Sequence, residues 1–145
     1  MTAKTTQRTE PAADLFQECR EEAETIRRNL AADRARIERD EADLPRMRQK
    51  LDEVWADGSP VREEFRFGLQ LFVEHLRTRR RLLSVQGQSL AAVERDDFQA
   101  WLALRDELNR DAALERAQDA ALGRVNELLD RELPWRGAVQ STATH

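Results

Sequence analysis

The sequence predicts an all-α protein built from long amphipathic helices, and three observations support this fold class. Charged residues make up 36% of the 145 residues and apolar residues 40%, a balance that suits helices burying one stripe and exposing the rest. Only five Gly and four Pro interrupt the chain. The β-branched residues that strands favour are scarce and do not alternate with polar ones. The length suits one domain.

Residues 1–13 are expected to form a disordered leader, because they are rich in Thr, Ala and Gln and include Pro11. From Phe16 onward, apolar residues recur every seven positions, which predicts a first helix over 14–56. One series contains Phe16, Ala23, Leu30, Ile37, Leu44 and Leu51, and a second series, three residues on, contains Cys19, Ile26, Asp33, Asp40, Met47 and Val54.

This heptad seam is the pattern that a helix needs to lie along a partner helix. Asp33 and Asp40 interrupt the seam, and polar residues at such positions can specify the partner at a cost in stability. Pro45 removes one intrahelical hydrogen bond and clashes with the preceding turn. We therefore expect a kink or a break near 43–45, with Asp43 available as the cap of a resumed helix.

A second helix is expected over 60–94. The preceding Gly58 can adopt the left-handed end of a helix, and Ser59 followed by Pro60 suits the start of the next one. Leucines recur every seven residues within this helix. They are Leu69, Leu76, Leu83 and Leu90.

A third helix is expected over 96–133, with Asp96 or Asp97 as its N-cap and Pro134 directly after its end. The residues from 134 to 145 then form a C-terminal tail. Residues 14–133 would make a single helical domain, an elongated bundle or coiled-coil hairpin of three long helices.

No catalytic, cofactor or metal motif is recognisable, so we predict a protein that is not an enzyme and binds no cofactor. His75 has Phe72 three residues before it, where a di-iron helix would carry Glu. The stretch 87–91 superficially echoes a nucleophile elbow but lacks the second Gly and the preceding strand that this motif requires.

The seam predicts a non-enzymatic protein that functions in protein–protein interaction or assembly through its amphipathic coiled-coil helices. The expected partner is another protein or a second copy, in a homo-oligomer or a hetero-complex. Trp135, in the tail, is expected either to fold back onto the bundle or to anchor a partner. The candidate interface residues are Phe16, Ala23, Ile26, Leu30, Ile37, Leu44, Met47, Leu51 and Trp135.

A basic cluster formed by Arg77, Arg79, Arg80 and Arg81 raises the alternative of a helical DNA-binding regulator. In zipper-type DNA readers the basic region precedes the leucine repeat, whereas this cluster lies inside the repeat. The net charge of −4 also opposes binding to nucleic acid. Nucleic acid is therefore not the expected partner.

The cytoplasm is the expected location. Cys19 is the single cysteine and cannot form an internal disulfide, which fits a reducing compartment. No run of apolar residues approaches the roughly 18 to 20 residues that a membrane span requires. Residues 1–13 also lack the apolar core of a signal peptide.

The stretch from Leu82 to Phe98, followed by Trp101, Arg105 and Leu108, resembles the helical hairpin of flagellar and type III export chaperones. The resemblance covers about a quarter of the chain and implies an adaptor or chaperone-like role for a helical hairpin. The helix expected over 14–56 is additional to that small pattern.

Overall fold

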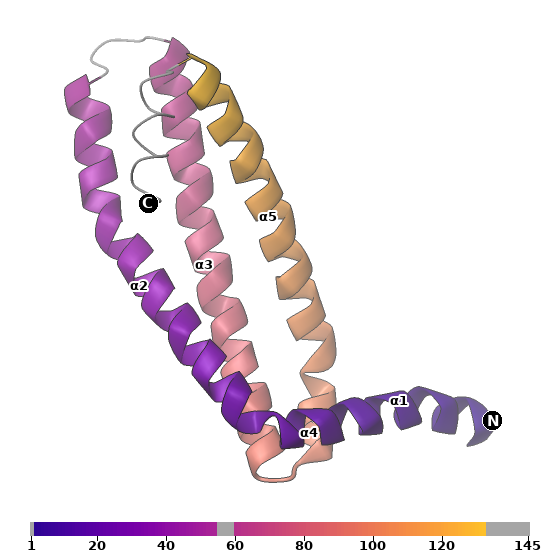
Figure 1. Cartoon of the computed structure of the whole chain (residues 1–145). Helices are drawn as coiled ribbons and strands as arrows, with labels where there is room; N and C mark the ends of the chain where they lie inside the picture. Colours follow the sequence, from indigo (N-terminus) through magenta and orange to yellow (C-terminus); the bar gives the residue numbers. More distant parts are fainter. Residues whose placement is uncertain (1, 55–59, 133–145) are drawn as a thin grey trace. The chain divides into compact units, whose positions relative to one another are not determined.

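The computed structural model describes the backbone of residues 2–54 and 60–132 and the side chains of residues 11–53 and 62–131 (Figure 1). The described residues contain no strand, so the predicted all-α class is confirmed. The helices are α1 (Thr2–Glu21), α2 (Ala23–Val54), α3 (Pro60–Glu94), α4 (Phe98–Ala103) and α5 (Arg105–Glu132).

The chain divides into two compact units. Unit 1 contains residues 1–38 and 79–112, and unit 2 contains residues 39–78 and 113–145. Thus α1 and α4 belong to unit 1, whereas each of the helices α2, α3 and α5 has one part in unit 1 and one part in unit 2. The sequence does not reveal this division, because all three long helices continue through its boundaries.

The predicted first helix is divided between α1 and α2, which meet at a turn at Glu22 (Figure 1). Backbone hydrogen bonds continue across the turn, since the Glu22 N–H donates to the Glu18 carbonyl and the Ile26 N–H donates to the Glu22 carbonyl. The chain can therefore change direction there at little cost in unsatisfied backbone groups. No Gly or Pro marks the position.

Residues 2–13, for which the sequence predicts a disordered leader, belong to α1. Ala12, Phe16 and Cys19 pack into one apolar cluster of unit 1. Because tertiary packing of an apolar face is the main source of helix stability in proteins, these contacts stabilise the helix from about residue 12 onward.

α2 continues through Pro45, so of the predicted kink or break near 43–45 the break does not occur. Pro45 itself is exposed, while Leu44 and Met47 are half-buried and Leu51 is buried. Apolar contacts on both sides of the proline thus hold the helix together across the missing hydrogen bond.

α3 has the bounds expected from the sequence, Pro60–Glu94, and Asp97 caps the next helix as predicted. The Asp97 carboxylate accepts a hydrogen bond of 3.0 Å from the backbone N–H of Ala100. Asp96 in the same turn has a φ of 57°, a left-handed conformation that Asp tolerates better than most residues. Its side chain forms an ion pair of 3.1 Å with Arg20 of α1.

The predicted third helix over 96–133 is divided at Leu104 into α4 and α5. The Leu104 N–H donates to the carbonyls of Leu102 and Trp101, which tightens the end of α4. The sequence has no Gly or Pro here. Trp101 in α4 is buried in unit 1.

The cap makes the stability of unit 1 depend on pH, because the hydrogen bond from the Ala100 N–H lowers the pKa of Asp97, with Arg95 acting in the same direction. A carboxyl whose pKa is lower in the folded state stabilises the fold above its unfolded pKa. This contribution is lost as the pH falls through the folded pKa. We expect the melting temperature of the natural protein to fall more between pH 7 and about pH 3 than that of Asp97→Asn.

The Asn variant keeps a capping oxygen that does not titrate, and all other carboxyls are shared by the two proteins. Thermal melts followed by circular dichroism measure the difference. Identical pH dependence in both proteins would show that the cap contributes no proton linkage.

Candidate interaction surface

The predicted seam is covered within the chain itself. Phe16, Ile37 and Leu51 are buried, and Trp135 lies outside the described residues. That the seam binds another molecule stays a prediction, but its most buried positions are already occupied by contacts within the chain. The remaining predicted interface residues are half-buried: Ala23, Ile26, Leu30, Leu44 and Met47.

Phe16 belongs to an aromatic cluster that joins α1 to α4 in unit 1. Its ring centroid lies 5.3 Å from that of Phe98 and 5.3 Å from that of Trp101. Phe98 and Trp101 stack at 5.9 Å. The guanidinium carbon of Arg105 lies 4.6 Å from the centroid of the Trp101 ring, a cation–π distance. These contacts build a folding core and not a free surface.

Cys19 packs against the same cluster. Burial raises the pKa of its thiol, and the positive charge of Arg105 offsets part of that rise. The thiol is therefore protonated near neutral pH and reacts slowly. This environment agrees with a packing role for the single cysteine.

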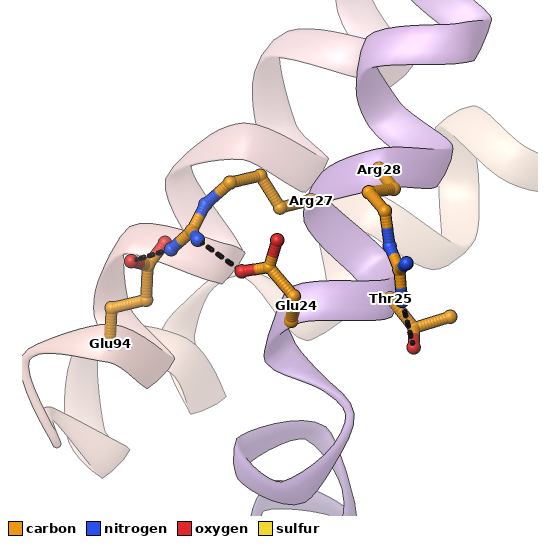
Figure 2. A network of polar contacts seen from close by, with 5 residues as sticks. All are labelled: Glu24, Thr25, Arg27, Arg28 and Glu94. Atoms are coloured by element: carbon orange, nitrogen blue, oxygen red, sulfur yellow. Dashed lines mark hydrogen bonds and ion pairs between the residues drawn. The ribbon is translucent and has the colours of Figure 1, made fainter.

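A network of charged side chains links α2 to the end of α3 in unit 1 (Figure 2). Arg27 lies between two carboxylates, with an ion pair of 2.6 Å to Glu24 and a second ion pair to Glu94 of α3. Arg28 donates to the Thr25 hydroxyl at 3.5 Å. Because these side chains are exposed, each pair contributes about 0–1 kcal/mol. The network therefore contributes only weakly to the contact between α2 and α3.

In unit 2, α3 and α5 run antiparallel in close contact. A Cβ atom at Gly68 would lie 2.9 Å from Cγ1 of Val125, so glycine permits this approach. Further along, His75 is buried on α3 and its Nε2 atom lies 3.7 Å from Oε1 of Glu115 on α5. Within residues 2–54 and 60–132, no group of three or more His, Cys, Asp or Glu side chains could hold a metal ion.

The basic cluster does not form one uniform face. Arg77, Arg80 and Arg81 are exposed, whereas Arg79 is half-buried. Both Arg79 and Arg80 also take part in polar or electrostatic contacts within the protein. The two arginines left without such a contact among the described residues are Arg77 and Arg81.

Among the described residues, unit 2 exposes three large apolar side chains on α3 and α5. They are Phe67 on α3, which is 59% exposed, and Leu114 and Leu128 on α5, which are 41% and 39% exposed. In the part of unit 1 whose side chains are described, the exposed large apolar residue is Leu15, at 39%. We refer to Phe67, Leu114, Ala121 and Leu128 as the α3–α5 face.

The contact between Gly68 and Val125 explains why these residues belong together. It shows which side of α5 faces α3, and Ala121 and Leu128 lie four residues before and three residues after Val125, on neighbouring positions of that side. Phe67 directly precedes Gly68 on α3. The face therefore borders the α3–α5 contact, and the two helices lie side by side there (Figure 1).

The sequence contained a signal for this face, since Leu114, Ala121 and Leu128 are seven residues apart. The spacing alone does not distinguish an outward stripe from an inward one. Phe67 has no comparable signal, because its neighbours at 63 and 74 are both Glu.

Among the described residues, no helix combines the length and the apolar character that crossing a bilayer requires. No protein-family model matches the sequence, and no match was found among curated proteins or solved structures.

Proposed function

We propose that the protein is a non-enzymatic interaction or assembly protein that acts through the outer surfaces of its helices, with the α3–α5 face as its contact surface. The exposure of Phe67 at 59% is the observation on which this proposal chiefly rests. Aromatic side chains are enriched at protein interfaces relative to the rest of the protein surface. The proposal includes a cytoplasmic location, which the single cysteine favours.

The energetics favour a protein partner for this face. Each square ångström of apolar surface removed from water contributes about 25 cal/mol, so covering one Phe and two Leu side chains supplies a few kcal/mol. Ala121, between Leu114 and Leu128 on the same stripe, lets a second helix approach closely. An adaptor or chaperone-like role would use the face in the same way, as a helix-on-helix contact of coiled-coil type.

DNA binding through Arg77–Arg81 is the weaker alternative, because Arg79 is half-buried and contacts within the protein already involve Arg79 and Arg80. Retention on duplex DNA that falls with added salt, and that is lost on replacing Arg77 and Arg81 by Gln, would favour this alternative over the proposed function.

A photo-crosslinking experiment tests the proposed function. Benzoylphenylalanine replaces Phe67 in the full chain, expressed in its native host, and a matched probe replaces Gln88, an exposed residue of α3 in unit 1. We expect irradiation to give a discrete protein adduct from position 67 and none from position 88. Absence of any adduct from position 67, with the protein folded, would overturn the proposal.

A further inference from the structure

We infer that the occupant of the α3–α5 face is a second copy of the same chain, in a symmetric dimer. This inference rests on the proposed function and specifies its partner. It comes from the charges that flank the apolar residues, which have opposite sign on the two helices of the face.

The α3 edge is acidic. Glu74 lies seven residues after Phe67 and so on the same side of α3, and it is exposed. Its carboxylate has no ion pair among the described residues. The α3 edge therefore presents an unpaired negative charge beside an exposed aromatic ring.

The α5 edge is basic. Arg124 lies between Ala121 and Leu128 on α5, and Arg131 follows Leu128 by three residues. Both are exposed, and neither forms an ion pair with a described residue. Unpaired positive charges thus flank the leucines, as the unpaired acid flanks Phe67.

A face with one acidic and one basic edge is complementary to itself. A two-fold axis parallel to the helices sets α3 of one copy over α5 of the other, and repeats the same contact on the second side. Phe67 of one copy then packs on Ala121 and Leu128 of its partner, and Glu74 lies toward the partner's Arg124. Juxtaposed opposite charges set this pairing, and the apolar residues supply the affinity.

Sedimentation velocity over a range of concentrations tests this dimer. We expect the natural protein to be dimeric at micromolar concentrations and Leu114→Glu/Leu128→Glu to be monomeric. Leu15→Glu in unit 1 is the matched control, because Leu15 is as exposed as Leu128 but lies outside the face. It should dimerise like the natural protein.

Charge exchange gives a second readout that leaves the apolar residues intact. Glu74→Arg places like charges together and should weaken the dimer by about tenfold, as should Arg124→Glu. The double variant with both changes should regain most of the lost affinity. All of these positions are exposed, so folding, checked by circular dichroism, should be unaffected.

A natural protein that stays monomeric throughout, or a dimer that Leu114→Glu/Leu128→Glu leaves intact, would overturn this inference. If the double variant Glu74→Arg/Arg124→Glu binds its partner no more tightly than the two separate losses of affinity predict, the two-fold pairing would be contradicted. The proposed function fails separately. If the protein is monomeric and position 67 crosslinks to a different protein, only the inference of a second copy is wrong. If it is monomeric and position 67 gives no adduct, both this inference and the proposed function are wrong.

Discussion

Replacing Ile37 by Asp is expected to unfold unit 1. Ile37 is 2% exposed, so the variant loses the burial of a large apolar side chain, about 2–5 kcal/mol. It also places a carboxylate where no water can solvate it. Together, the lost burial and the buried carboxylate approach the free energy of unfolding of a typical domain, roughly 5–15 kcal/mol. Circular dichroism should show loss of the cooperative urea transition at every protein concentration.

Ala35→Asp is the matched control, because Ala35 is exposed on the same helix two residues earlier. It should change the free energy of unfolding by about 1 kcal/mol or less. If Ile37→Asp instead stays folded and merely loses association with another molecule, the seam is an intermolecular interface and not part of this chain's core.

Trp101→Ala is expected to reduce the free energy of unfolding of unit 1 by about 3–5 kcal/mol. Trp101 is 1% exposed and contacts both Phe16 and Phe98, so its loss removes one of the two ring contacts between α1 and α4 and leaves only that of Phe16 with Phe98. Urea titrations followed by circular dichroism measure the change.

Comparing Trp101→Phe with Trp101→Ala separates the contribution of aromatic ring packing from that of the whole indole side chain. The indole Nε1 atom is buried with no hydrogen-bond partner among the described residues, and removing such an orphaned donor offsets part of the lost packing. We therefore expect Trp101→Phe to lose far less stability than Trp101→Ala. Equal losses in the two variants would mean that the ring contacts with Phe16 contribute little.

Features of the fold with strong local signals could be predicted from the sequence. α3 begins at the predicted Pro60, and the cap of α4 is the predicted Asp97. The turn at Glu22 and the division at Leu104 could not be predicted, because neither has a Gly or Pro and both depend on tertiary packing. The break offered as one outcome at Pro45 does not occur, since contacts through Leu44 and Leu51 outweigh the local penalty of the proline.

The candidate surface could be predicted only in part. Sevenfold spacing identifies both the stripe containing Ile37 and the stripe containing Leu114, but it does not distinguish the buried stripe from the exposed one. What separates them is which stripe the chain covers by itself, and that depends on how α2, α3 and α5 pack within each unit. Phe67 shows the limit most clearly, because a single aromatic residue among charged neighbours has no periodicity to detect.

The most direct measurement places the position-67 crosslinker in the Leu114→Glu/Leu128→Glu chain and compares its adduct with that of the otherwise natural chain. We expect the adduct to disappear while the circular dichroism spectrum of the purified protein at room temperature keeps the helical signal of the natural chain, because the leucines are needed for contact and the helices form without them. An adduct of undiminished yield would contradict the claim that this face is where the protein meets its partner.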